Sequence, residues 1–501
     1  MVFVPELKPR LRPWPSLKQR AASLSGRGHL PFTAAAAVAG LVLSAVLVAA
    51  GGPWDSTGQR KAESARAAAE EGAGGADHGH RPAPGGPHSA PSAPPVLDSL
   101  GASAHAADAP AGRRLAEVLK PLLSDRALGE RRAVSVTDAG SGRELYGKDA
   151  GAAFTPASTT KIATGTAVLS AAGPDHRLRT RTVLGPGSRV TLVGGGDPTL
   201  TARSDAEGNA SLRTLAAATA KELRRRGVGK AELAYDASLF RGERLHPIGR
   251  NENLAPVTAL MADQGRLDDS TGGTAERAED PAADAARAFA GFLRAEGVRT
   301  EGRPAGKRAP KKSEALASVS SPPLSALVER MLTHSDNDIA EALARQVAVA
   351  AGRPADFAGA GKAVRAELAA LQLPLEGARF ADGSGLDRAD RLSAKLLTAL
   401  LTRAADPDRP GLRPVLTGLP VAAFTGTLAH RYDKEGQRQG TGLVRAKTGT
   451  LTGVNTLAGS VVDREGRLLV FAFMTSGSTA PGETQAAMDR MASALADCGC
   501  R

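Results

Sequence analysis

Two residues near position 160 carry the side chains needed for nucleophilic attack on a carbonyl carbon. Ser158 and Lys161 stand three residues apart at the start of a segment with helical apolar spacing. On a helix, residues i and i+3 share a face, so the hydroxyl and the amine can meet. A serine hydroxyl needs a neighbouring base, and a lysine is such a base only when its pKa is lowered. The alternative for this pair alone is a helix N-cap serine followed by a surface lysine.

A second polar group, Ser335-Asp336-Asn337, lies between two segments with helical periodicity. A tight turn there would point Ser335 and Asn337 in the same direction, with Asp336 turned aside to hold the loop. Taken alone, the group also fits an N-cap cluster for the following helix.

The third group, Lys447-Thr448-Gly449-Thr450, lies on an expected strand. Alternation along a strand puts Lys447 and Gly449 on one face, and a glycine lets another backbone or a substrate approach closely. The alternative is an edge strand that a lysine protects from pairing.

In this order, the three groups resemble the active-site set of serine penicillin-recognising enzymes. Residues 115–497 as a whole resemble D-Ala-D-Ala carboxypeptidase family S13, the type-C low-molecular-mass penicillin-binding proteins, in their actinobacterial form. Further signatures of that family are matched by LVGGGDPTL (192–200), YDASLF (235–240), APVTALMADQG (255–265) and DGSGLDR (382–388). The family usually has a serine where this chain has Asp387, which leaves a hydroxyl role at that position unsupported.

The resemblance implies the reaction and its partners. Ser158 would attack the carbonyl between two D-alanines of a peptidoglycan stem peptide, release the terminal one and form an acyl-enzyme. β-Lactam antibiotics would act as covalent inhibitors of the same serine. The family also implies D,D-endopeptidase activity as an addition, and it requires no metal and no organic cofactor.

Roles for the other groups follow from the same resemblance. Lys161 would be the base, its pKa lowered by desolvation and by the like charge of Lys447. Ser335 would relay the proton to the leaving amine in concert with Lys447, and Asn337 would bind the substrate's peptide amide.

Substrate-binding and oxyanion-binding groups are implied as well. The hydroxyls of Thr448 and Thr450, beside the close approach allowed by Gly449, would hold the terminal carboxylate together with Lys447. Two backbone N–H groups, those of Ser158 and Thr450, would bind the tetrahedral oxyanion. Ser384 and Leu386 would line the pocket for the peptide side chain.

Three rival functions are weighed against the carboxypeptidase. A serine β-lactamase is disfavoured because none of the five asparagines follows a leucine, as a class A deacylation loop would require, and the middle group lacks a Tyr-x-Asn form. A non-catalytic peptidoglycan-binding module of the same fold is disfavoured by three intact groups. Nucleic-acid binding, suggested by the net charge of +12, conflicts with the export signal and the lack of a basic patch interleaved with aromatics.

The N-terminal region predicts export. Residues 1–31 are a basic cytoplasmic segment, and residues 32–52 run without a charge for about 30 Å, one bilayer core. That stretch is either a transmembrane anchor or a signal peptide. Residues 53–112 form an Ala/Pro/Gly linker that is too poor in apolar residues to fold. The remainder is therefore expected outside the cytoplasm, either anchored to the membrane or secreted.

The helices and strands that must position these groups, together with the family resemblance, indicate an α/β (α+β) fold of the penicillin-binding and serine β-lactamase-like type. Strands at both ends of residues 113–185 and 319–501 should form one antiparallel sheet flanked by helices. Residues 186–318 read as an inserted α/β accessory domain, with helices near 211–226 and 282–296. The two cysteines, Cys498 and Cys500, are expected to be inert or to form a small terminal disulfide.

Overall fold

The computed structural model describes residues 111–499. The predicted basic segment, membrane span and nearly all of the linker therefore lie outside the described residues. The last two linker residues, 111 and 112, instead begin helix α4 (Ala111–Leu123). Between residues 111 and 499, no helix combines the length and the apolar character needed to cross a bilayer. Cys498 is disulfide-bonded, and Cys500 is beyond the described range.

The first sheet joins the two ends of the described chain, as predicted. Its order is β2-β1-β10-β9-β8, and its pairs are antiparallel. Nearly all residues of β9 and β10 are buried on both faces, so helices must cover both sides of this sheet. The strands are β1 (Arg131–Asp138), β2 (Glu144–Lys148), β8 (Arg445–Leu451), β9 (Val454–Val462) and β10 (Leu468–Ser476).

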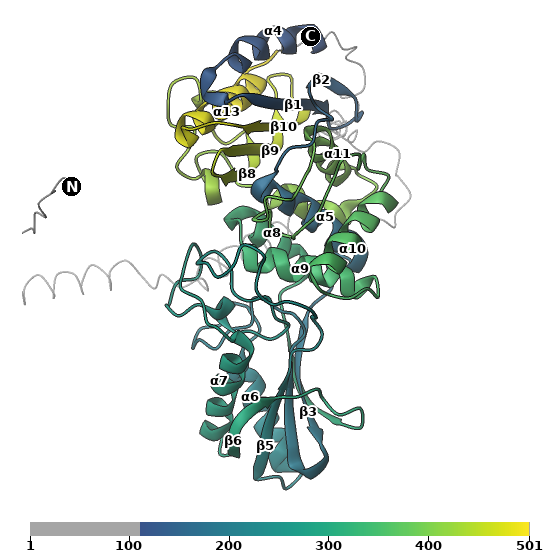
Figure 1. Ribbon diagram of the computed structural model, residues 1–501, viewed down its shortest axis with the longest axis vertical. Coiled ribbons are helices and arrows are strands. Elements are labelled where there is room, and N and C mark those ends of the chain that lie inside the picture. The colour runs from purple at the N-terminus through teal and green to yellow at the C-terminus, as the bar shows by residue number, and fades with distance from the viewer. Residues whose placement is uncertain (1–110, 500–501) are drawn as a thin grey trace, which may run out of the picture. The chain divides into compact units, whose positions relative to one another are not determined.

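Helices cover both faces of the first sheet (Figure 1). On one face, α4 and α13 (Pro481–Ala496) pack around Leu119, Phe471 and Met488. On the other face, α11 contacts β1 and β10 and links the sheet to a helical half. That half consists of α5 (Thr160–Ala172), α8 (Leu324–His334), α9 (Asn337–Ala350), α10 (Phe357–Ala370) and α11 (Ala394–Ala405).

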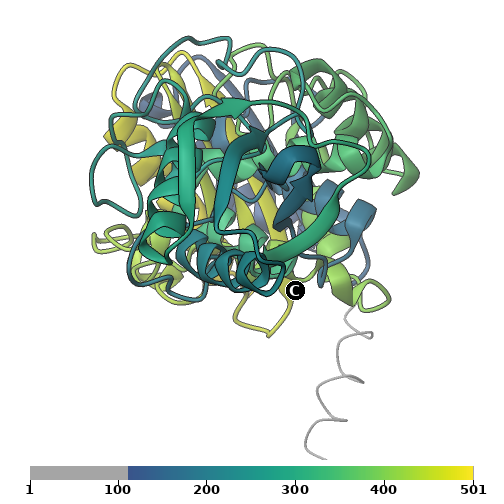
Figure 2. The ribbon, with the colours of Figure 1, turned by 90° about the horizontal axis from the view of Figure 1, so that it is seen from below.

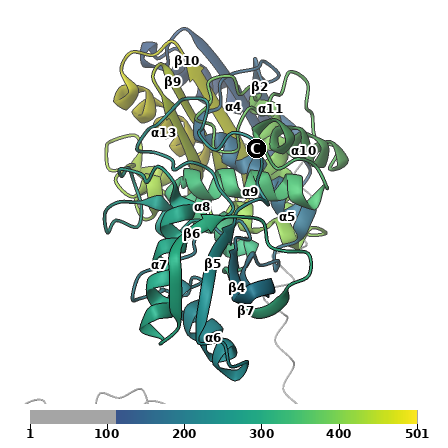
Figure 3. The same ribbon diagram turned by 60° about the horizontal axis from the view of Figure 1, so that its bottom comes forward.

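The insertion has its own five-stranded sheet, ordered β6-β5-β4-β3-β7. Figure 2 shows its teal strands end-on, and Figure 3 shows α8 and α9 between the two sheets. Helices α6 (Leu212–Arg225) and α7 (Pro281–Ala295) pack against this sheet around Leu215, Leu233 and Phe289. The strands are β3 (Arg179–Gly185), β4 (Arg189–Val193), β5 (Lys230–Asp236), β6 (Arg299–Gly306) and β7 (Glu314–Ser320).

The insertion is longer at both ends than the predicted range 186–318. Strand β3 precedes this range and β7 runs past its end, yet the two strands pair with each other and belong to the second sheet. Their pairing explains the difference, because the chain enters and leaves the insertion through two neighbouring strands rather than through loops.

A glycine lets the insertion approach the catalytic domain closely. A Cβ on Gly196 would clash with Gln346 Nε2 on α9. The Gly195 carbonyl in turn accepts a hydrogen bond of 2.8 Å from Gln346 on α9. The close approach therefore ties the end of β4 to the helical half.

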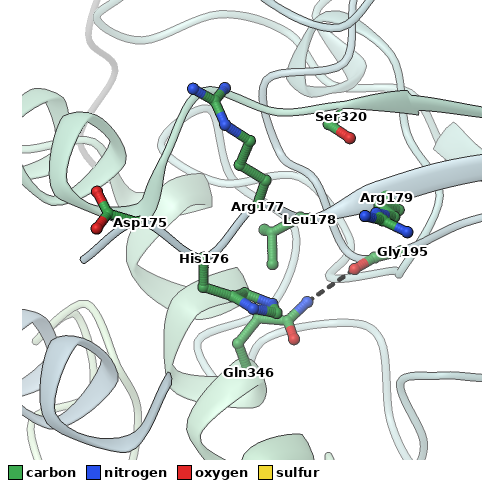
Figure 4. Close-up of a pocket in the computed structure, with 8 residues that line it drawn as sticks. All are labelled: Asp175, His176, Arg177, Leu178, Arg179, Gly195, Ser320 and Gln346. Carbon is green, nitrogen blue, oxygen red and sulfur yellow. Dashed lines mark hydrogen bonds between the residues drawn. The ribbon is translucent and has the colours of Figure 1, made fainter. Parts of the chain in front are cut away.

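A cavity of about 520 Å³ opens at the same junction (Figure 4). None of the residues predicted to do chemistry lines it, so this cavity is separate from the catalytic groups described below. Its lining residues are Asp175, His176, Arg177, Leu178, Arg179, Gly195, Ser320 and Gln346.

Candidate active site

Ser158 and Lys161 meet at the start of α5, as their spacing predicts. Ser158 lies in a single 3₁₀ turn (Ala157–Thr159) that leads directly into the helix, and Lys161 follows in the first helical turn. Lys161 Nζ lies 3.1 Å from Ser158 Oγ. The serine is partly exposed, whereas the lysine is completely buried. A solvent-accessible hydroxyl therefore has a desolvated amine beside it.

Two further contacts determine how the Lys161 amine is oriented. Its Nζ donates to Asn337 Oδ1 and to the Ser384 carbonyl oxygen, both at 2.7 Å. A carbonyl oxygen cannot donate, so both contacts use N–H groups of the lysine. In a neutral amine the remaining position is the lone pair, which then faces Ser158 Oγ. This is the orientation required to accept the serine proton.

The Ser335-Asp336-Asn337 group forms the tight turn that the sequence predicts. Ser335 ends α8 in the left-handed conformation, with φ 57°. Asp336 is turned aside: its carboxylate accepts from the Ile339 N–H at 3.0 Å and from Gln264 Nε2 at 2.6 Å. The N-cap interpretation is therefore also correct: Asp336 caps α9, Ser335 ends α8, and Asn337 is the first residue of α9.

The Asn337 amide is held at both ends. Its Oδ1 accepts from Lys161, and its Nδ2 donates to the Asn253 carbonyl at 3.2 Å. An amide offers two donors and an acceptor with two lone pairs, so one hydrogen and one lone pair stay available for a substrate. The predicted contact with the substrate is compatible with this geometry.

Lys447 and Gly449 share the face of β8 that packs on the start of α5. Lys447 is completely buried and donates to the Thr448 carbonyl at 2.8 Å. A Cβ on Gly449 would lie 2.8 Å from the Pro156 carbonyl oxygen and 3.1 Å from Ala157 Cβ. The expected close approach of another backbone to this glycine is therefore confirmed.

The outer edge of β8, which is not paired with β9, presents backbone donors. On this edge the Ala446 N–H donates to the Pro420 carbonyl. N–H groups alternate between the two edges of a strand, so the Thr450 N–H points to the same side. The Thr448 hydroxyl donates to Thr427 Oγ1 at 2.8 Å, and the Thr450 hydroxyl accepts from Gln485 at 3.2 Å.

Burial lowers the pKa of both lysines, but neighbouring charges act on the two pKa values in opposite directions. Burial lowers the pKa of Lys161 to about 8, while the charges of Asp382, Glu341, Asp336 and Asp390 act to raise it. Burial and the charge of Lys161 hold the pKa of Lys447 well below its usual range. Desolvation of Lys161 is thus as expected. The charge of Lys447 was expected to lower the pKa of Lys161 as well, but the charges that act on Lys161 are carboxylates, which raise its pKa. The repulsion between the two ammonium groups instead lowers the pKa of Lys447.

Sequence reasoning missed the three carboxylates beneath Lys161. Burial and the charge of Asp382 raise the pKa of Asp390 to about 10 and that of Glu341 to about 7. Burial alone would raise the pKa of Asp382, but its hydrogen bond with His246 helps to hold it below the ordinary value. Asp390 is therefore the group that keeps its proton. The signal in the sequence was the DGSGLDR segment, which contains Asp382.

Ser384 contributes its backbone rather than its side chain. The side chain is fully buried and its hydroxyl donates to Asp382 Oδ2 at 3.0 Å, so it differs from the pocket-lining position that the resemblance implied. Leu386 is partly buried and packs against the helical core. Asp387, where the family usually has serine, accepts from the Ala389 N–H at 2.8 Å.

Similar sequences and a similar fold occur in known proteins. A family model described as D-Ala-D-Ala carboxypeptidase 3 (S13) matches residues 115–273 and 267–497. Carboxypeptidase Rv3627c of Mycobacterium tuberculosis is 37% identical over 438 residues, which are 84% of this chain and 92% of that protein. Carboxypeptidase DacB of Mycolicibacterium smegmatis is 37% identical over 409 residues, covering 79% of this chain and 86% of the relative.

A solved structure shares the fold. Penicillin-binding protein 4 (dacB) from Haemophilus influenzae superimposes with a TM-score of 0.60 and 21% sequence identity, covering 76% of this chain and 98% of that chain. The match supports the predicted penicillin-binding fold.

Proposed function

Because the chain belongs to the D-Ala-D-Ala carboxypeptidase 3 (S13) family, we propose that Ser158 is the nucleophile of a serine D-alanyl-D-alanine carboxypeptidase. The protein is a peptidase of this family that acts on peptidoglycan. The observation that carries the assignment is the Lys161 amine, which lies 3.1 Å from Ser158 Oγ with its two other contacts on carbonyl oxygens.

The proposed first step is acylation. Ser158 Oγ attacks the carbonyl carbon between the two D-alanines while Lys161 Nζ accepts the hydroxyl proton. The developing oxyanion lies between the N–H groups of Ser158 and Thr450. Collapse of the tetrahedral species breaks the C–N bond, and the amine leaves with a proton delivered through Ser335 and Lys447.

Substrate binding is proposed along the edge of β8. The terminal carboxylate lies against Lys447 and the hydroxyls of Thr448 and Thr450, and Asn337 bonds the peptide amide with its remaining groups. Leu386 is proposed beside the peptide side chain. Water then hydrolyses the ester at Ser158 and restores the free enzyme.

A covalent-labelling experiment tests this assignment. The purified full chain is incubated with a fluorescent penicillin, and wild type is compared with Ser158→Ala. Labelling of wild type alone is expected, together with D-alanine release from a stem-peptide mimic. Equal labelling of both, or of neither, contradicts the assignment. Rapid nitrocefin turnover without D-alanine release would instead identify a serine β-lactamase.

D,D-endopeptidase activity is proposed as an addition, because the same acyl-enzyme forms when a cross-linked D-alanyl bond reaches Ser158. The test is cleavage of a cross-linked muropeptide dimer. Release of monomers at a Ser158-dependent rate supports the addition, and release of D-alanine alone contradicts it.

We also infer that the enzyme acts outside the cytoplasm, held by residues 32–52 as an anchor or released after cleavage. The support is the 21-residue uncharged stretch that follows a basic segment. Fractionation of cells that express a tagged chain tests this inference. Recovery of the protein in the cytoplasm contradicts it, and the mass of the mature protein distinguishes the anchored from the cleaved form.

A further inference from the structure

A buried histidine from the insertion reaches the carboxylates beneath Lys161. His246 lies in the chain between β5 and α7, and its Nε2 is 2.9 Å from Asp382 Oδ2. The side chains of the pair are 1% and 0% exposed. Two segments of the chain that are far apart in sequence therefore share one hydrogen bond in the interior.

The surroundings of His246 establish which ring nitrogen carries the proton. Its Nδ1 accepts the N–H of Ile248 at 3.3 Å, so in the neutral ring the hydrogen is on Nε2. That hydrogen points at Asp382. The ring also meets Phe357 edge-on, with 5.4 Å between the ring centroids, which limits its rotation.

Asp382 in turn organises the loop that holds the catalytic lysine. Its carboxylate accepts from the Gly385 N–H at 2.7 Å, the Asp387 N–H at 2.8 Å and the Ser384 hydroxyl at 3.0 Å. Glu341 accepts from the Ser384 N–H at 2.9 Å on the other side. The Ser384 carbonyl is thereby aimed at Lys161 Nζ.

His246, Glu341 and Asp382 also have the composition of a metal site. Backbone and hydroxyl donors, however, already occupy the carboxylate oxygens that a cation would need. The contacts instead form a hydrogen-bonded support for the loop.

We propose that His246 is a positioning residue for Lys161, which acts by donating a hydrogen bond to Asp382 and so fixes the Ser384 carbonyl at the amine. The inference rests on the proposed roles of Ser158 and Lys161. It gives the insertion a part in the chemistry, because a residue of the insertion supports the base of the catalytic domain.

The proposal predicts how the charge at Lys161 responds when His246 is changed. The charged groups that face His246 are Asp382, Asp387 and Glu341. In His246→Leu, Asp382 keeps three donors and stays ionised, but its charge is less compensated. A stronger negative field favours the ammonium form of Lys161, so the pH midpoint of acylation moves upward.

The test measures the second-order rate of fluorescent-penicillin acylation from pH 6 to 10 for the full chain, below the melting temperature of each variant. His246→Leu should slow acylation roughly tenfold at pH 7, as for a lost hydrogen bond to a charged group, and should raise the midpoint. His246→Gln, whose amide can still donate, should recover most of the rate. His176→Leu, at an exposed histidine, is the matched control and should behave as wild type.

Each outcome decides the proposal. Wild-type rate and midpoint in His246→Leu overturn it, and so does an equal loss in the leucine and glutamine variants with an unchanged midpoint. If His246→Leu does not fold, Asp382→Asn tests the same bond. Removal of that negative charge should slow acylation and lower the midpoint, and an unchanged midpoint overturns the proposal. Absence of Ser158-dependent labelling in wild type would instead contradict the proposed function.

Discussion

The candidate site lies between a helical wall, formed by α5 and α9, and a strand wall, formed by β8. Each wall contains one completely buried lysine, but the charges around the two lysines are opposite in sign. Lys161, on the helical wall, has four carboxyl groups acting on it, and its pKa is about 8. On the strand wall, burial and the neighbouring ammonium act on Lys447, whose pKa lies well below the usual range.

Because of this difference, one residue type can serve two purposes in one site. Burial lowers the pKa of both amines and so favours their neutral forms. The carboxylates bring the pKa of Lys161 back to a value where proton transfer in both directions is easy. In the proposed mechanism, Lys447 takes up a proton when the substrate carboxylate binds, because that negative charge supplies the counter-charge that Lys447 otherwise lacks.

Removal of the helical-wall lysine should have the largest effect. Lys161→Ala leaves Ser158 without a base, and we expect the rate of acylation by fluorescent penicillin to fall about 10³-fold above pH 8. The loss should be smaller at lower pH, where Lys161 of the wild type is itself protonated. Lys447→Ala should lose less at high pH, since its main contribution is charge. Equal losses with the same pH dependence would show that the walls do not differ in this way.

A methyl group between the walls should have the next largest effect. In Gly449→Ala the new Cβ would clash with Thr456 Oγ1 on β9 and with the Pro156 carbonyl oxygen, so the spacing between β8 and the start of α5 must change. We expect acylation to slow by about 100-fold, as for an ångström-scale displacement of catalytic groups. Gly151→Ala, where a Cβ would meet no atom within 4 Å, is the control and should leave the rate unchanged.

The pH dependence tests the charge of the helical wall directly. Lys161 is a base only when neutral, so the acylation rate should fall as the pH drops below about 8 and level off above it. The expected slope is about tenfold per pH unit on the acid side. A midpoint near the ordinary lysine value would show that burial does not control this group.

The smallest effect is expected at the edge of the strand wall. Thr448→Val removes one hydroxyl from the proposed carboxylate site, and we expect KM for a stem-peptide mimic to rise about tenfold with little change in kcat. Thr427→Val removes only the partner of that hydroxyl and should change KM less. A change confined to kcat would contradict a role for Thr448 in substrate binding.

Local patterns were enough to predict most of the geometry of the candidate site. The i, i+3 spacing brought Ser158 to Lys161, strand alternation put Lys447 and Gly449 on one face, and the polar turn left Asp336 as a cap. Each of these relations depends on the backbone geometry of a single element, which a short stretch of sequence specifies.

The supporting groups could not be predicted in that way. His246, Glu341 and Asp382 come from a loop of the insertion, the middle of α9 and a separate loop, and no local spacing relates them. Glu341 resembles any acidic residue on a helix until the fold buries it. The carboxylate field on Lys161, and the strands that extend the insertion beyond 186–318, both depend on tertiary pairing.

The pairing of β1 with β10 has a consequence for the order in which the enzyme matures. Arg131 lies opposite Ser476, so the sheet closes only after nearly the whole chain has been synthesised. Contacts between such distant residues form slowly because a long loop must be ordered first. Lys447 and the Thr450 N–H therefore reach Ser158 late, and a nascent chain does not yet contain the assembled candidate site. The topology therefore delays the peptidase activity until synthesis of the chain is nearly complete.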